Sequence, residues 1–440
     1  MSPRIYVVAV MATLLVGLAA ITAFNAWVDP LELVDWTGVA GLDRSKPLLN
    51  DYSRVSKPVV ACRLKPSFII LGTSRSEHSL DPQWPGLRAR GYRAFNLAFP
   101  GASIYEIRRA FENSVACGRL QGALIELDFY AFNVHAGNDS DFEDGLFRRH
   151  RGDWLAPAIE KLRLLSSLDM VRESIRTLRA PPGPVDFEQD GRENALRYAQ
   201  RDRIWGGTHG AFLRSEQAQY IDPFFSEPRS QRPDWRLADG TPNTADLLAI
   251  LDVARRNGVR LWFYFAPVHA RQLETWRALG LGPGIDDWKS TVVRSLYAHA
   301  AALGYAGSLA VWDFSGYNSV TTEAVPPLGD ATTRMSGYWE SSHMRKHVGD
   351  LMLARIFPDR ATADRLAVPA DFGVRLTASN IDVNTQRTRQ AAAAYRASHP
   401  AAMAEVAAEV ATAKADVSPK RQGTLAGALA SSASIAAPVR

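Results

Sequence analysis

The sequence is poor in cysteine and lacks the common cofactor motifs. Its 440 residues include only two cysteines, which excludes a cysteine-rich metal site and a scaffold held together by many disulfides. It contains no Gly-x-x-x-x-Gly-Lys-Ser/Thr phosphate loop, no Gly-x-Gly-x-x-Gly segment after a strand and no His-Glu-x-x-His motif. Neither a cofactor nor a metal ion is therefore predicted.

Concentrated charge of one sign is also missing. The net charge is +5, and no run of lysine and arginine concentrates it, so nucleic-acid binding is not expected. Hydrophobic residues make up 46% of the chain and charged residues 22%, which is typical of a folded protein rather than a disordered one.

The N-terminal stretch from Ile5 to Phe24 has no charged residue at all. Twenty helical residues at about 1.5 Å each span about 30 Å, the thickness of the bilayer core. Arg4 precedes the stretch, and Asp29 and Glu32 follow it, which favours a cytoplasmic N-terminus. We predict an anchor over residues 1–27, in a single-pass protein of the cell inner membrane with a periplasmic body. A cleaved signal peptide is the alternative, because small residues follow the apolar stretch.

The body alternates between short apolar runs and amphipathic segments, which predicts a mostly parallel sheet with helical crossovers. We expect a flavodoxin-like three-layer α/β/α domain over residues 67–358. A lead-in, rich in proline and glycine and expected to be irregular, covers 28–66. A polar insertion, 134–240, should hold helices near 155–165 and 168–178. The tail, 359–440, is rich in alanine and should be helical at first and disordered at its end.

The first apolar run, Phe68 to Leu71, ends in Gly72-Thr73-Ser74-Arg75. Ligands of parallel α/β sheets bind outside the carboxyl ends of the strands, so Ser74 is a candidate nucleophile. If a helix begins there, its free N–H groups can stabilise an oxyanion. The alternative is an ordinary N-cap serine.

A serine nucleophile needs a base that a third group orients. Among nine histidines, His343 is the candidate, because Glu340 lies three residues earlier and a tight turn can bring its carboxylate to the imidazole. The alternative is an exposed histidine at a helix start. We expect further pocket residues beside the strand ends: Arg75, His78, Asn96, Asp128, His269 and Asp313, the last as a reserve acid.

These motifs taken together resemble those of the SGNH (GDSL-like) hydrolase superfamily. The strand ending in Gly-x-Ser-Arg, the segment that runs from Asn96 to Gly101, and the acid-x-x-His before the last predicted helix carry the resemblance, over residues 25–130 and 244–357. The similarity is greatest to the membrane-anchored bacterial branch, which includes alginate O-acetyltransferase-like and D-alanine-transfer proteins.

The resemblance implies that Ser74 is the nucleophile and first oxyanion donor, that Gly101 is the second donor, and that His343 is the base. Two positions depart from the family pattern. Glu340 stands where the family usually has aspartate. The family's Gly-x-Asn sequence is not evident after the third strand, where Asp128 lies and Asn133 comes only further on. An ionised Asp128 would repel an oxyanion.

The expected function is therefore serine-dependent acyl transfer on an envelope or extracellular glycan, either as an O-acyl esterase or as an O-acyltransferase with a membrane protein as acyl donor. The alternative is a non-catalytic envelope assembly or glycan-binding protein of the same fold. The aromatic residues of the insertion are expected to form a satellite core, with a sugar-stacking wall as the alternative: Tyr198, Trp205, Phe212, Tyr220, Phe224 and Phe225.

Cys62 and Cys117 each lie a few residues before a predicted strand, the first and the third. In a flavodoxin-like order these strands are parallel neighbours, so both thiols fall at the amino-terminal edge of the sheet. Because export supplies an oxidising compartment, we predict a disulfide between them. The alternative is two buried thiols.

Overall fold

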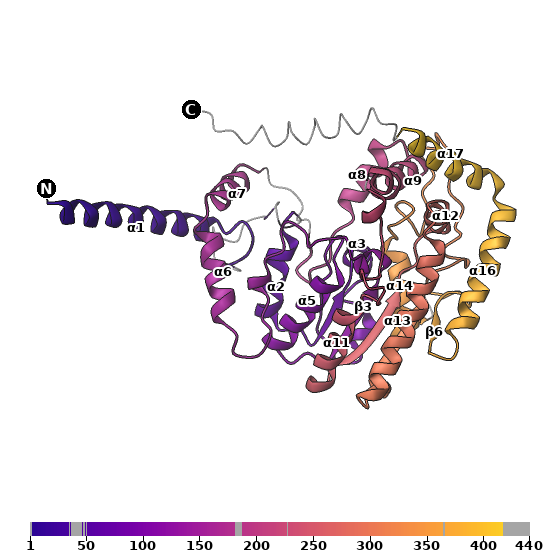
Figure 1. The fold of residues 1–440 in the computed structure, drawn as a ribbon, viewed down its shortest axis with the longest axis horizontal. Helices are drawn as coiled ribbons and strands as arrows, with labels where there is room; N and C mark the ends of the chain where they lie inside the picture. The colour runs from indigo at the N-terminus through magenta and orange to yellow at the C-terminus, as the bar shows by residue number, and fades with distance from the viewer. Residues whose placement is uncertain are drawn as a thin grey trace.

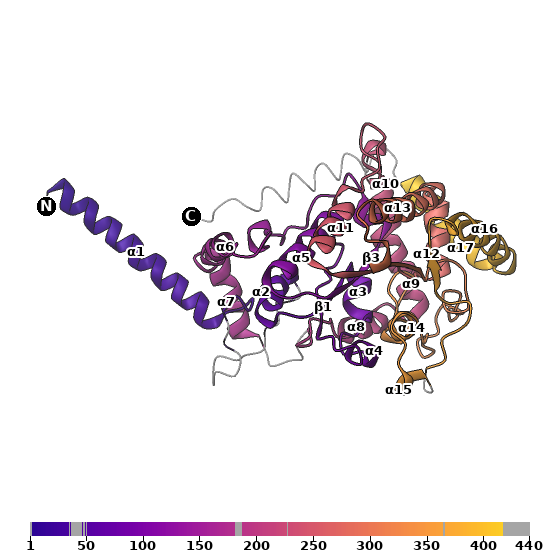
Figure 2. The ribbon, with the colours of Figure 1, turned by 90° about the horizontal axis from the view of Figure 1, so that it is seen from below.

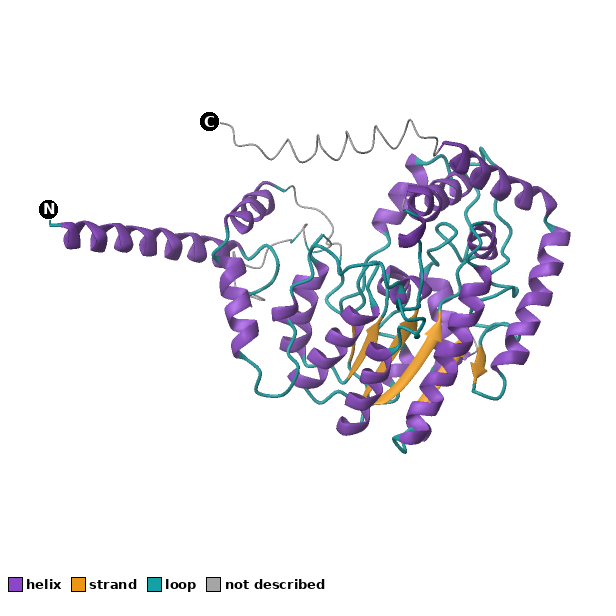
Figure 3. Cartoon of the chain, in the orientation of Figure 1, coloured by secondary structure: helices purple, strands orange, loops and turns teal. Residues whose placement is uncertain are grey.

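The computed structural model describes residues 2–34, 36, 46, 49, 51–180, 187–226, 228–363 and 366–416. Its centre is a sheet of six strands in the order β2-β1-β3-β4-β5-β6. The first five strands are parallel, and β6 pairs antiparallel with β5 (Figures 1 and 3). This confirms the predicted α/β class with a mostly parallel sheet. The strands are β1 Phe68–Leu71, β2 Ala94–Asn96, β3 Gly122–Leu127, β4 Arg260–Phe265, β5 Leu309–Asp313 and β6 Val374–Leu376.

Both faces of the sheet are buried under helices. Alternate residues of β1 point to opposite sides: Ile69 and Leu71 belong to one hydrophobic core, and Phe68 and Ile70 to the other. The first core receives α2 Ser53–Leu64, α5 Ile104–Cys117, α11 Ala245–Asn257 and α13 Gly282–Ala302. The second receives α4 Pro85–Arg88, α14 Lys346–Ile356 and the residue after α3 Ser74–Ser79. Because the strands are covered on both sides, most of their residues are apolar, without the regular alternation of a strand that has one exposed face.

The lead-in was expected to be irregular, and this was wrong for its second half. Residues Ser53–Leu64 form α2 even though Pro58 lies inside the helix and lacks the N–H that the helix needs. Tertiary contacts stabilise it nonetheless: Val55 and Val59 are buried in the first core, and the side chain of Asn113 donates to the Pro58 carbonyl at 3.3 Å.

Helix α1, Pro3–Val28, is the one helix in the described part of the chain that is long and apolar enough to cross a membrane. It projects from the body, and the hairpin of α6 Leu155–Leu165 and α7 Leu168–Arg179 packs against its C-terminal end (Figures 1 and 2). Both hairpin helices occur where the insertion was expected to be helical. The rest of the insertion holds α8 Leu196–Ile204, α9 Thr208–Glu216, the π-helical turn η3 Gln217–Ile221 and α10 Asp222–Ser226.

The fold continues beyond residue 358, where the α/β domain was expected to end. Strand β6 extends the sheet, and Leu376 and Ile381 are completely buried in the first core. Helix α16, Ile381–Ser398, lies along α13, and α17, Pro400–Asp416, lies along α12, Ala270–Ala278 (Figure 1). The tail is thus helical as predicted but forms part of the domain. The predicted disordered end, from residue 417, lies outside the described residues.

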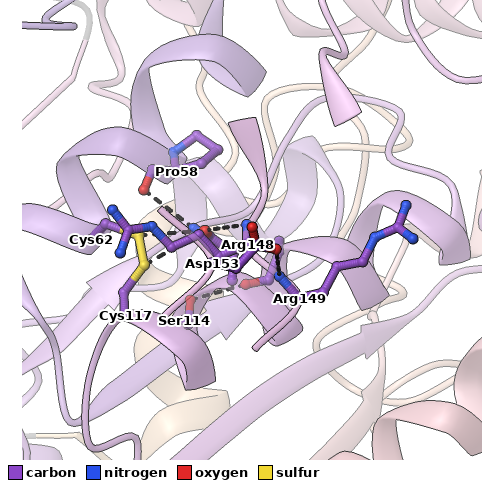
Figure 4. The surroundings of a disulfide bond; sticks show 9 residues. Pro58, Cys62, Ser114, Cys117, Arg148, Arg149 and Asp153 are labelled. Atoms are coloured by element: carbon purple, nitrogen blue, oxygen red, sulfur yellow. Dashed lines mark hydrogen bonds between the residues drawn. A yellow bond between two sulfur atoms is a disulfide. The ribbon is translucent and has the colours of Figure 1, made fainter. Parts of the chain in front are cut away.

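Cys62 and Cys117 are joined by a disulfide, with their Cα atoms 5.0 Å apart (Figure 4). The bond links the C-terminal ends of α2 and α5, each of which leads into a strand. It therefore lies at the amino-terminal edge of the sheet, opposite the strand ends that carry the candidate site.

Candidate functional site

Ser74 lies directly after β1, at the first position of α3. Gly72 allows this turn to pack tightly, because a Cβ at position 72 would come within 2.5 Å of the Glu126 side chain. The Glu126 carboxylate accepts the Thr73 amide at 2.8 Å and the Ser76 hydroxyl at 2.5 Å. Glu126 on β3 thereby fixes the turn that presents Ser74 at the end of the sheet.

Ser74, His343 and Glu340 form a continuous hydrogen-bonded chain. The Ser74 Oγ lies 2.7 Å from His343 Nε2, and His343 Nδ1 contacts the Glu340 carboxylate. The three predicted residues therefore meet, although 269 positions separate Ser74 from His343. A carboxylate on Nδ1 fixes the imidazole tautomer, so that Nε2 is the atom available to accept the serine proton.

A narrow loop holds Glu340 and His343 together. Tyr338 and Met344 form an antiparallel bridge, and the Trp339 amide donates to the His343 carbonyl at 2.9 Å. Burial by itself would raise the pKa of Glu340. The charge of His343 and hydrogen bonds from His343, Ser215 and the Ser342 amide outweigh it and lower that pKa below its usual value. The carboxylate is therefore ionised at neutral pH.

A cavity of about 210 Å³ opens beside Ser74 and His343. The insertion contributes part of its wall through η3, so this segment lies over the strand ends. The lining residues are Thr73, Ser74, Arg75, Gly101, Ala102, Asp128, Tyr130, Ala131, Gln219, Tyr220, Ser342 and His343.

Arg75 neutralises the carboxylate of Asp128, the residue that follows β3. Its guanidinium contacts the Asp128 carboxylate and also donates to the Tyr220 hydroxyl at 3.0 Å and to the Ser342 Oγ at 2.8 Å. Burial would lower the pKa of Arg75, but Tyr220, Glu126 and Glu340 together raise it above its usual value. The cavity wall therefore holds a permanent positive charge next to the Asp128 carboxylate.

Gly101 faces the same cavity from the loop after β2. Its φ of +60° is left-handed, and a Cβ there would meet open space, so the backbone conformation rather than crowding favours glycine. Helix α2 holds this loop: Lys57 donates to the Ala98 carbonyl at 2.8 Å, and the Arg54 guanidinium donates to the Pro100 carbonyl.

Three predicted pocket residues have structural roles away from the cavity. Asn96 is buried and donates to the carbonyls of Ser76 and Leu80, which fixes the end of α3. His269 caps α12 and contacts the Glu323 carbonyl at 2.7 Å, and burial is the main cause that lowers its pKa to about 4. Asp313 forms an ion pair with Lys289 at 2.5 Å, and Glu340 occupies the position for which Asp313 was the reserve.

His78 lies behind the catalytic candidates. Its ring centroid is 6.4 Å from that of His343 and 4.2 Å from that of Tyr198, and neither of its nitrogens has a hydrogen-bond partner in the described part of the chain. Burial, with smaller contributions from His343, Arg192 and Lys57, lowers its pKa to about 3. His78 is therefore neutral and packs beside the site without touching Ser74.

The aromatic residues of the insertion divide between core and site. Phe212 lies in the second core, and Tyr220 and Phe224 belong to a small separate cluster. Tyr220 also lines the cavity, and the ring of Tyr198 lies 5.2 Å from that of His343.

Sequence reasoning assigned no site role to Glu126, Ser342 or Gln219. A carboxylate inside an otherwise apolar strand was the one signal that could have singled out Glu126.

In comparisons with known proteins, no protein-family model and no curated protein matches the chain.

Proposed function

We propose that the chain is a membrane-anchored serine acyl-transfer enzyme of the SGNH type, acting as an O-acyl esterase or O-acyltransferase. The observation that carries the proposal is the hydrogen-bonded series Ser74–His343–Glu340 beside a cavity at the carboxyl end of the sheet. Strand order 2-1-3-4-5 among the parallel strands, with helices on both faces, supports the flavodoxin-like three-layer arrangement that this superfamily implies.

In the proposed first step, His343 Nε2 accepts the Ser74 proton while Ser74 Oγ bonds to the acyl carbon of an ester. The tetrahedral oxyanion receives hydrogen bonds from the amides of Ser74 and Gly101. His343 then returns the proton to the departing alcohol, which leaves an acyl-Ser74. Glu340 remains ionised and stabilises the imidazolium.

In the second step, water or a sugar hydroxyl attacks the acyl-Ser74, with His343 again accepting the proton. The bond between Ser74 Oγ and the acyl carbon then breaks, and His343 returns the proton to Ser74 Oγ. Water yields a carboxylic acid, and a sugar hydroxyl yields a new ester. Gln219 and Tyr220 in the cavity wall offer polar and aromatic contacts of the kind that a sugar acceptor uses. The pairing of Asp128 with Arg75 supports oxyanion formation near this wall, because the nearby negative charge is compensated.

The proposed location follows from α1 and its flanking charges: the inner membrane, with the body in the periplasm. The disulfide supports export, because such bonds persist in oxidising compartments. An envelope glycan is then the proposed acceptor, and a membrane protein the proposed acyl donor.

A fluorophosphonate probe on the full-length chain in detergent tests the proposal. We expect one covalent adduct, on the peptide that contains Ser74, and none in Ser74→Ala. Release of 4-nitrophenol from its acetate should fall by at least about three orders of magnitude in both Ser74→Ala and His343→Ala, with little further loss in the double variant. Ser230→Ala, at an exposed serine, is the control and should behave as wild type. Unchanged turnover in Ser74→Ala would favour the non-catalytic alternative.

A further inference from the structure

The α6–α7 hairpin exposes apolar residues that a folded protein usually buries. Seven large apolar side chains on it are between 37% and 68% exposed. Outside α1, the whole remaining described chain exposes only seven others, and those are scattered. The exposed hairpin residues are Trp154, Leu155, Ile159, Leu162, Leu168, Ile175 and Leu178.

These residues form one stripe on each helix. Leu155, Ile159 and Leu162 recur at the spacing of one helical face, while Pro157 and Leu165 of the same helix are buried. On α7, Leu168, Ile175 and Leu178 form a stripe that flanks the buried face of the helix. Each helix therefore has one side that packs on the body and a separate apolar stripe that is exposed to solvent.

The hairpin is fixed to the end of α1. Asn25 is completely buried there: its Nδ2 donates to the Leu165 carbonyl at 2.8 Å, and its Oδ1 accepts the Ser174 hydroxyl at 2.9 Å. Thr22 Oγ1 lies 2.9 Å from the hydroxyl of Ser166 in the turn between the helices. The position of the hairpin relative to α1 is thus set by buried hydrogen bonds.

The hairpin lies on the side of the body that faces α1 (Figures 1 and 2), and α6 runs transverse to α1 beside the C-terminal end of that helix (Figure 1). A helix that crosses a bilayer places its axis across the membrane, so a helix lying across its end runs along the membrane surface. Trp27, at 44% exposed, and Trp154, at 63%, occur in this region, and tryptophan favours the membrane–water interface.

Charge supports the same placement. Residues 148–179 contain eight lysines and arginines against four acidic residues, a net charge of +4 within a chain whose total is +5. A basic amphipathic segment with an apolar face is the pattern of helices that lie in the interface of a membrane with anionic lipids.

We infer that the α6–α7 hairpin is a second membrane contact, which lies in the headgroup region of an anionic bilayer at the C-terminal end of α1 and inserts its apolar stripe among the lipids. The inference depends on α1 crossing the membrane and is independent of the chemistry proposed for Ser74.

Depth-dependent fluorescence quenching tests it. The full-length chain carrying Ile159→Cys or Leu168→Cys, labelled with an environment-sensitive dye, is reconstituted at one chain per nanodisc of phosphatidylcholine and phosphatidylglycerol. We expect blue-shifted emission and quenching by lipids spin-labelled near the headgroup, greater than by lipids labelled at the chain terminus. Leu328→Cys, at a residue 65% exposed on the loop between β5 and α14, is the control and should report water.

Two results would overturn the inference. Labels at 159 and 168 that stay as water-exposed as the label at 328 would leave the stripe without contact to lipid. Labels that become shielded only in discs holding two chains, with no quenching by lipid, would instead identify the stripe as an interface between copies of this chain.

Discussion

Glu340 contacts His343 and is itself hydrogen-bonded by the Ser215 side chain and the Ser342 amide. Glu340→Gln keeps the size of the side chain but removes the charge that stabilises the imidazolium. We expect the rate of ester cleavage to fall by roughly a hundredfold to a thousandfold. The measurement is the initial rate with 4-nitrophenyl acetate at saturating substrate. A loss as complete as that of Ser74→Ala would mean that glutamate does more than orient the base.

His78 makes the fold sensitive to acid. Its pKa is about 3 in the folded chain against a usual value near 6.5, so the unfolded state binds the extra proton first as the pH falls. Neutral His78 makes its full contribution to the free energy of unfolding above pH 6.5. Between about pH 6.5 and 3, this free energy should fall by about 1.4 kcal/mol for each pH unit.

His78→Gln removes this titration, so the free energy of unfolding should vary less steeply with pH below about 6. Urea denaturation at several pH values measures the slope. His150→Gln, at an exposed histidine, is the matched control and should keep the wild-type slope. Equal slopes in all three proteins would contradict the assignment of His78 as a buried neutral group.

At the scale of single residues, two signals in the sequence located the candidate site. One was a position just past a predicted strand, and the other was a close spacing between an acid and a histidine. Ser74, Glu340 and His343 were found in this way. Asn96 is the last residue of β2 and His269 follows β4, yet their side chains bind backbone carbonyls within the body. Whether a polar side chain after a strand turns toward a cavity or toward neighbouring backbone depends on distant segments, which one sequence does not specify.

Among the elements, α2 connects the disulfide with the site, since Cys62 lies at one end and Arg54 and Lys57 hold the loop of Gly101 at the other. Sequence reasoning treated this segment as irregular because Pro58 counts against a helix. The stabilising contacts come from α5 and the sheet, and local propensity contains no information about them.

Replacing both cysteines by alanine tests the contribution of the disulfide to stability. The bond closes a loop with a sequence separation of 55. Its loss should lower the free energy of unfolding by about 4 kcal/mol in the chain-entropy model. Chemical denaturation of the double variant measures the change, and reduced wild-type protein is the control. Labelling of Ser74 by a fluorophosphonate should remain within about twofold of wild type under folding conditions, because the bond and the site lie at opposite ends of the strands.

For the molecule as a whole, the segment after residue 358 decides where the domain ends. Phe372, Leu376 and Ile381 are completely buried, and Arg271 forms ion pairs with Glu405 and Glu409 of α17. The sequence predicted a domain that ends at residue 358 and an alanine-rich helical tail, but a few buried residues and one antiparallel strand suffice to join this tail to the sheet.

A chain that ends at Pro358 should therefore lose about 5 kcal/mol or more from these three apolar side chains alone, which is comparable to the whole stability of many domains. We expect it to unfold or to be degraded by trypsin within the body. The comparison is a chain that ends at Asp416, which keeps β6, α16 and α17 and should melt cooperatively. If the shorter chain instead forms a protease-resistant body, the α/β domain ends at residue 358 and this prediction is wrong.

Asn25 lies near the end of α1 and is hydrogen-bonded to the α6–α7 hairpin, so the connection between α1 and the body is stiff. A flexible linker allows a catalytic domain to sample a volume that grows with the length of the linker. Here the hydrogen bonds of Asn25 and Thr22 couple rotation of the body to rotation of α1. With α1 across the membrane, as proposed, they would hold the cavity at a constant height above the lipid. A polymeric acceptor would then have to move past a cavity entrance that stays in place. The spacing of the hydroxyl groups along the polymer, rather than motion of the protein, would determine which of them contact Ser74.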